Sequence, residues 1–141
     1  MPFIRSISGV RATLGDALTP FIIAEYTAAF ASYLPPGIVV VGRDGRPSGE
    51  WIEKIVCATL AACGREVLEL GVVPTPTVQL FAEHQAMAGG ISISASHNPV
   101  EWNGLKFLNN QGIFLNAEEN AAFWQCLEER RFHFVADQHG E

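Results

Sequence analysis

The chain has 141 residues, of which 48% are hydrophobic and 17% charged, and its formal net charge at pH 7 is −6. This length predicts one domain, and the negative charge argues against a nucleic-acid partner, because binding to a phosphate backbone requires a basic surface. No apolar run is long enough to predict a membrane span, and three cysteines without C-x-x-C spacing indicate a reducing, cytoplasmic compartment rather than a disulfide framework.

The first half of the chain predicts two helix–strand units. Thr19-Pro20 supplies a cap and a proline at the first helical position of a helix that Pro35-Pro36-Gly37 ends. An apolar strand follows over residues 38–41. Ser48 can cap a second helix with its hydroxyl, and a strand over residues 66–70 comes after that helix.

The second half continues the same alternation. A short helix around Leu80 leads to a strand over residues 91–95, and residues 105–108 form another strand-like run. Asn116 and Glu119 have the spacing of a capping box at the start of a last helix. Strands that alternate with helices in this way predict an α/β fold, a three-layer α/β/α domain around a mainly parallel, mixed sheet of four strands.

The most informative segment is GGISISASHNP, residues 89–99. Ser96 would lie just past the strand over residues 91–95, at the carboxyl end of that strand, where open α/β sheets bind their ligands. Lys106 lies far enough along the chain for a returning strand to bring its ammonium beside the Ser96 hydroxyl, where it could act as an acid or base or as a charge for phosphate. His97 and Asn98 add hydrogen-bond donors. The pattern favours phosphoryl transfer through Ser96.

The stretch SASHNPVEWNGLKF, residues 94–107, resembles the active-serine loop of the α-D-phosphohexomutases, the family of phosphoglucomutase, phosphomannomutase and the phosphoglucosamine mutases. Members of that family carry Thr/Ser-Ala-Ser-His-Asn-Pro followed by Asn-Gly-x-Lys. Three further segments match the family in the same order, at residues 8–11, 41–49 and 73–77. The resemblance covers most of the chain and identifies it as the N-terminal domain I of this family.

The resemblance implies a role for each matching residue. Ser96 would hold a phosphoryl group, give it to one hydroxyl of a hexose phosphate and recover it from another, through a bisphosphate intermediate that moves phosphate between C1 and C6. Hexose 1,6-bisphosphate is the implied activator. The other implied site residues are His97, Lys106 and Arg11 as catalytic residues, and Asn98 and Arg43 in the environment of the substrate and its phosphate.

The resemblance also implies a Mg²⁺ ion, held by the Ser96 phosphoryl group together with an aspartate-rich loop of a later domain. No Asp-x-Asp-x-Asp run occurs in this chain. Residues 1–131 are therefore predicted to form domain I, and residues 132–141 a tail or the start of a linker to the second domain. The implied partners are a sugar-phosphate substrate and the remaining domains. Alone, the domain is expected to be inactive or nearly so, and to self-associate through apolar surface that would otherwise meet its neighbour.

Other interpretations are weighed against this one. A non-catalytic phosphate-binding or regulatory module of the same fold remains an alternative. A serine hydrolase is disfavoured, because the chain lacks a G-x-S-x-G elbow and His97 is poorly placed to be the base for the serine beside it. Taken alone, Arg43 and Arg46 are typical of a solvated turn. The particular hexose is not predicted.

Overall fold

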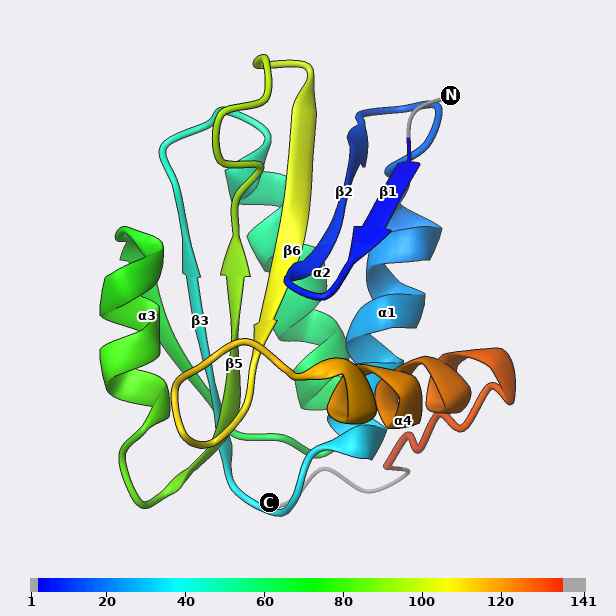
Figure 1. Ribbon diagram of the computed structural model, residues 1–141, viewed down its shortest axis with the longest axis vertical. Coiled ribbons are helices and arrows are strands. Elements are labelled where there is room, and N and C mark those ends of the chain that lie inside the picture. Colours follow the sequence, from blue (N-terminus) through cyan, green and yellow to red (C-terminus); the bar gives the residue numbers. More distant parts are fainter. Residues whose placement is uncertain (1–2, 136–141) are drawn as a thin grey trace.

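A six-stranded β-sheet forms the middle layer of the computed structural model, which describes residues 3–135 (Figure 1). The strands are β1 (Phe3–Ser6), β2 (Gly9–Thr13), β3 (Ile38–Arg43), β4 (Val67–Val72), β5 (Met87–Ile93) and β6 (Trp102–Leu108). The helices of the described chain are α1 (Pro20–Tyr33), α2 (Gly49–Ala62), α3 (Thr75–Ala82) and α4 (Ala117–Glu128). The arrangement confirms the predicted α/β/α class.

The strand order is β1-β2-β6-β5-β3-β4, and the pairing is mixed. β3 pairs parallel with β4 and β5, whereas β6 is antiparallel to β5 and β2, and β1 is antiparallel to β2. The prediction of four strands is wrong in number, because it omits the hairpin β1–β2. The alternation of apolar Val10 and Ala12 with charged Arg11 is the sequence signal for β2. A two-stranded hairpin has marginal stability by itself, and this one is stabilised by pairing with β6, which is far away in the sequence.

Two of the three predicted helix caps are confirmed. The Thr19 hydroxyl accepts a hydrogen bond from the Ile22 amide at 3.2 Å, and Asn116 and Glu119 form a reciprocal capping box. Ser48 precedes α2, but its side chain does not cap the helix. Its hydroxyl instead accepts a 2.8 Å bond from the buried amide of Asn103 on β6. A buried amide without a partner is costly, so this long-range bond takes the place of the predicted cap.

Helices α1, α2 and α4 pack on one face of the sheet and α3 packs on the other. The larger core includes three fully buried phenylalanines, Phe30 of α1, Phe107 of β6 and Phe123 of α4. Their ring centroids lie 4.8–5.3 Å apart, within the range of favourable aromatic contact. In residues 3–135 no helix combines the length and the apolar character needed to cross a membrane.

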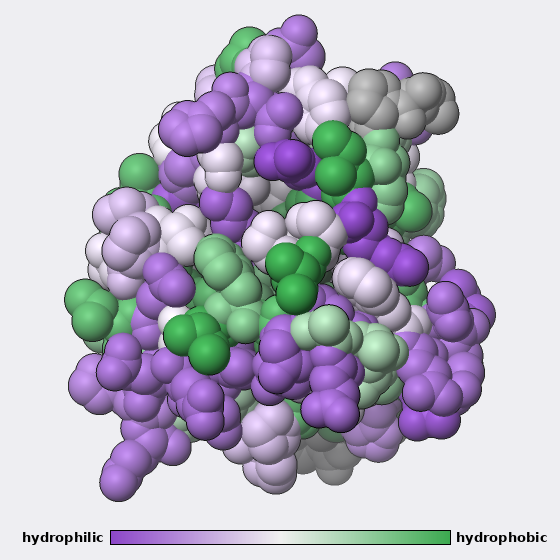
Figure 2. Space-filling view, viewed as in Figure 1, coloured by the Kyte–Doolittle hydropathy of each residue, from purple (hydrophilic) through white to green (hydrophobic). Residues whose placement is uncertain are grey.

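The face shown in Figure 2 carries hydrophobic residues across its middle, bordered by hydrophilic ones. The exposed large apolar side chains of the described residues include Ile7, Leu80 and Ile113. Exposed apolar surface is the basis for expecting the isolated domain to self-associate, and that expectation stays a prediction.

The end of the described chain lies against α2. The backbone amide of Val135 donates to the carbonyl of Ala62 at 2.9 Å. Residues 132–135 of the predicted tail are therefore attached to the domain, and residues 136–141 lie outside the described residues. The predicted boundary after residue 131 stays a prediction.

Gly104 allows β6 to lie close to β2, and its substitution tests this approach. A Cβ at Gly104 would overlap the carbonyl oxygen of Val10 and lie 2.9 Å from Cβ of Arg11. We expect Gly104→Ala to lower the free energy of unfolding by about 1–3 kcal/mol, because the backbone must move apart. Urea denaturation would measure the change.

Gly45→Ala is the matched control, because an added Cβ there meets no atom within 4 Å. Equal stability of the two variants would contradict the close packing of β2 on β6.

Candidate active site

Ser96 lies in the loop that follows β5, in a left-handed backbone conformation with φ of 56°. Such values are uncommon for residues with a side chain and are enriched at functional sites. Ser94 anchors the start of the loop, because its amide donates to the Gly104 carbonyl at 3.0 Å and its hydroxyl accepts from the Ser96 amide at 3.1 Å. The loop thus presents an exposed serine hydroxyl at the carboxyl end of a buried strand, as the sequence predicts.

Lys106 brings an ammonium to this hydroxyl. Its Nζ donates to Ser96 Oγ at 2.5 Å. Burial lowers the pKa of Lys106, the nearby Arg11 guanidinium lowers it further, and Asp44 opposes both effects. A lowered pKa raises the neutral fraction of a lysine near neutral pH, and this improves its capacity to exchange a proton with a hydroxyl.

Arg11 reaches the same place from β2. In the pairing of β2 with β6, Gly9 lies opposite Lys106 and Gly104 lies opposite Arg11. Residues two apart on a strand share a face, so Arg11 and Lys106 are diagonal neighbours on one face of the sheet. The two glycines opposite them have no side chains to occupy the space.

These groups line one pocket of about 120 Å³. Its lining includes Ser6, Ser8, Arg11, Ser94, Ser96 and Lys106. None of the residues that line it, all within the described part of the chain, is an aspartate or glutamate. The pocket therefore combines a hydroxyl with two basic side chains and suits an anionic ligand such as phosphate.

Three other predicted residues do not line this pocket. His97 is exposed, and Asn98 is half-buried with its amide bonded to the Ala95 carbonyl at 3.1 Å. Arg43 points to α2, where its Nε donates to Glu53 Oε1 at 2.7 Å. Their catalytic and phosphate-binding roles stay predictions, and Arg43 is committed to an ion pair that is largely shielded from solvent.

Arg46 lies next to this site, although the sequence predicts no role for it in the site. It lies in the loop between β3 and α2, which runs beside the serine loop at one end of the sheet (Figure 1). Its guanidinium donates hydrogen bonds to four backbone carbonyls, those of Ser96, Asn98 and Pro99 in the serine loop between β5 and β6, and that of Trp102 at the start of β6. The available signal is the Asp-Gly-Arg spacing, since Asp44 accepts the Arg46 amide in a turn typical of aspartate.

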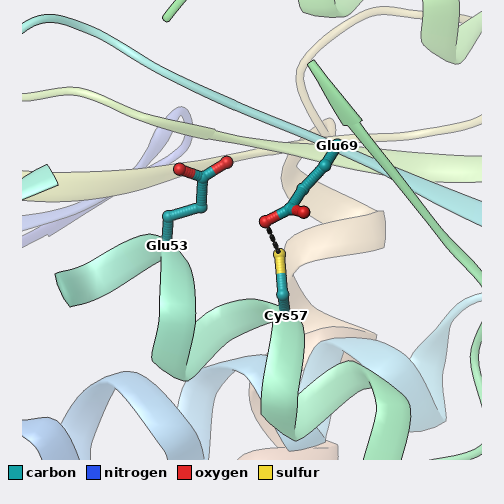
Figure 3. A group of neighbouring side chains, drawn as sticks. All are labelled: Glu53, Cys57 and Glu69. Carbon is teal, nitrogen blue, oxygen red and sulfur yellow. Dashed lines mark hydrogen bonds between the residues drawn. The ribbon is translucent and has the colours of Figure 1, made fainter. Parts of the chain in front are cut away.

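The side chains that could hold a metal ion are few in the part of the chain that the structure describes. Among residues 3–135, one group has metal-ligand side chains close together, namely Glu53, Cys57 and Glu69 (Figure 3). Glu53 already pairs with Arg43, and Cys57 Sγ donates to Glu69 at 3.2 Å. Burial raises the pKa of the Cys57 thiol, and the bond to Glu69 raises it further. A protonated thiol is a poor metal ligand, so we interpret this group as a hydrogen-bonded cluster.

The fold and the pocket define an α/β/α domain that carries a serine, paired with a lysine, on a loop at the carboxyl end of a central strand. Residues 4–134 match the family model described as phosphoglucomutase/phosphomannomutase, alpha/beta/alpha domain I. The chain therefore belongs to this family. The match confirms the resemblance found in the serine loop.

Individual relatives agree with the family. The chain is 43% identical over 130 residues to a phosphoglucosamine mutase of Natranaerobius thermophilus, covering 91% of this chain and 29% of the relative. It is 40% identical over 126 residues to a phosphoglucosamine mutase of Nautilia profundicola, covering 88% of this chain and 28% of the relative. A solved phosphoglucomutase/phosphomannomutase family protein from Burkholderia thailandensis superimposes with a TM-score of 0.79 at 26% identity, over 93% of this chain and 32% of that chain. This chain thus spans about three tenths of the length of these relatives.

The effect of the Arg11 charge on the pKa of Lys106 can be measured. We expect Arg11→Gln to raise the pKa of Lys106 toward its ordinary value, because the substitution removes a positive charge that disfavours the ammonium. The neutral fraction of Lys106 at a given pH then falls. An NMR titration of the lysine side chains would measure the shift.

Arg130→Gln serves as the control, since Arg130 pairs with Glu25 at 3.1 Å and does not line the pocket. A Lys106 pKa that stays constant or falls in Arg11→Gln would contradict the proximity of the two cations.

Proposed function

We propose that this chain is the phosphoserine-bearing domain I of a phosphohexomutase that interconverts hexose 1-phosphates and hexose 6-phosphates through a bisphosphate intermediate. The observation that carries the proposal is the contact between Lys106 Nζ and Ser96 Oγ in a pocket with Arg11 and without carboxylates. The names of the relatives support a sugar-phosphate substrate. The three cysteines are unpaired, which fits a reducing cytoplasm.

The proposed reaction is a phosphoryl transfer in two halves. In the first half, a hydroxyl of the hexose phosphate attacks the phosphorus on Ser96, and the bond from phosphorus to Ser96 Oγ breaks as the new ester forms. The proton of the sugar hydroxyl passes to water, and Oγ gains a proton from Lys106. In the second half, the bisphosphate has turned round, Lys106 takes the proton of Ser96, and Oγ attacks the other phosphoryl group. The bond from that phosphorus to the sugar oxygen breaks, and the sugar oxygen gains a proton from water.

The basic side chains supply the electrostatic part of this chemistry. A phosphoserine carries a charge of about −1.5 to −2 at neutral pH, and transfer depends chiefly on positioning and on stabilising the charge of the equatorial oxygens. Arg11 and Lys106 line the pocket from two neighbouring strands and are suited to this role. His97, Asn98 and Arg43 are proposed as outer contributors on the resemblance of their motifs alone.

Mg²⁺ fits this chain in part. When bound at the Ser96 phosphoryl group, the ion would neutralise charge on the group being transferred. The pocket provides no carboxylate, so the phosphoryl oxygens would be the ligands from this domain, and the remaining ligands are expected from another part of the protein. The isolated domain is accordingly expected to lack turnover.

Substitution of Ser96 tests the proposed function in the full-length natural protein that contains this chain. We expect Ser96→Ala to remove phosphate from the protein, as measured by intact mass and peptide mapping. Mutase turnover should fall by at least about 10³-fold, because the group that carries the phosphoryl is lost.

Ser32→Ala, at an exposed position of α1, is the control and should retain both properties. Equal turnover and equal phosphate content of the Ser96→Ala and wild-type proteins would instead support a non-catalytic phosphate-binding or regulatory module.

A further inference from the structure

The guanidinium of Arg46 uses every donor it has. An arginine side chain carries five N–H groups. Its Nε donates to Asp44 Oδ2 at 3.3 Å, one terminal nitrogen donates to the carbonyls of Pro99 at 2.6 Å and Trp102 at 3.0 Å, and the other donates to those of Ser96 at 3.0 Å and Asn98 at 2.6 Å. Three of the five bonds therefore hold the backbone of the loop that carries Ser96, and a fourth holds Trp102, the first residue of β6.

Asp44 fixes the position of Arg46. One carboxylate oxygen accepts the Arg46 backbone amide at 3.1 Å and the other accepts Nε. The amide of Asp44 donates to the carbonyl of Ile93, the last residue of β5, at 3.0 Å. The Arg46 side chain is 14% exposed. The residue after β3 is thus hydrogen-bonded to the end of β5. Asp44 fixes the guanidinium of Arg46 in the position from which it binds the serine loop.

Arg46 binds the loop at Ser96, the residue whose backbone conformation is strained. Ser96 has a positive φ of 56°, which is unfavourable for a residue with a Cβ. Its carbonyl is bonded to Arg46 and its hydroxyl to Lys106. Arg46 therefore stabilises from the backbone side the conformation in which the Ser96 hydroxyl meets Lys106.

We propose that Arg46 is a positioning residue for phosphoryl transfer, which holds the Ser96 loop in the conformation that places Oγ against Lys106. The inference deepens the proposed function and rests on it. The four hydrogen bonds from Arg46 to residues 96–102 all go to backbone carbonyls, and Arg46 does not line the pocket. Its effect on the reaction is therefore on the geometry of Ser96 and not on the charge of the substrate.

Arg65 provides a matched control elsewhere in the domain. Its two terminal nitrogens also donate to four backbone carbonyls. These belong to Ala31 in the last turn of α1 and to Leu34, Pro35 and Gly37, which follow the helix. Arg65 does not line the serine pocket. Each arginine thus binds four backbone carbonyls, but Arg46 binds at the serine loop and Arg65 does not.

The test compares Arg46→Lys with Arg65→Lys in the full-length natural protein. Lysine keeps the charge but has three donors in place of five, so each variant loses some of its hydrogen bonds to backbone carbonyls. For Arg46→Lys we expect kcat to fall about 10–100-fold, because a misplaced reacting group costs rate, while KM changes by less than about threefold. Hydrogen exchange in peptides covering residues 94–102 should become at least about 10-fold faster.

Arg65→Lys should lower the thermal midpoint without changing kcat or exchange in residues 94–102. If Arg46→Lys does not fold, Asp44→Asn is the second variant, and it should speed the same exchange to a smaller extent. Exchange is the readout for this variant, because Asp44 also acts on the pKa of Lys106 and its loss would change kcat by that route. A kcat within about twofold of that of Arg65→Lys, or a loss of kcat without faster exchange, would overturn the proposal.

The two proposals fail in different ways. A wild-type protein without mutase turnover and without phosphate on Ser96 would overturn the proposed function. The exchange measurement would still decide whether Arg46 holds the loop, because it requires no substrate. Unchanged exchange in Arg46→Lys, relative to Arg65→Lys, would overturn the positioning role whatever the activity of the wild-type protein.

Discussion

The position of β6 in the sheet is the constraint on which the site depends. β6 lies between β2 and β5 and is antiparallel to both. Its pairing with β5 returns Lys106 to the loop that follows β5, where Nζ reaches Ser96 Oγ. Its pairing with β2 places Arg11 diagonally across from Lys106. A slip of one residue in either register would turn these side chains to the other face of the sheet, so the backbone ladders of β6 fix the chemistry of the pocket.

The electrostatics of the pocket differ from those of the whole chain. The chain has a net charge of −6, yet the pocket beside Ser96 contains Arg11 and Lys106 and no carboxylate. Burial and the neighbouring guanidinium both disfavour the protonated form of Lys106. A phosphoryl group between the two cations would offset their mutual repulsion, and this is the property that a carrier of phosphate requires. The net charge of the chain therefore argues against a nucleic-acid partner but does not describe the site.

The two arginines of the Gly-Arg-Asp-Gly-Arg segment show how far a motif predicts function. Both can be recognised in the sequence as part of a family motif, but their partners come from distant elements. Arg43 bonds to Glu53 on α2, and Arg46 bonds to the serine loop beyond β5. Local spacing suggests that these arginines matter, but it does not indicate which of them faces the site, because that depends on which loops the sheet brings together.

The sequence by itself determined the elements governed by short-range interactions. These include the caps at Thr19 and Asn116, the turn-bounded strand before Ser96 and the α/β/α class, because propensities, caps and periodicity act within a few residues. The spacing of Ser96 and Lys106 also predicted their contact, since an antiparallel return between neighbouring strands is itself local. Only the tertiary structure decided that β1 and β2 extend the sheet, that the Ser48 hydroxyl bonds to Asn103 rather than to its own helix, and that Arg46 clamps the serine loop. Each of these depends on pairing or burial between segments far apart in the chain, which no local pattern encodes.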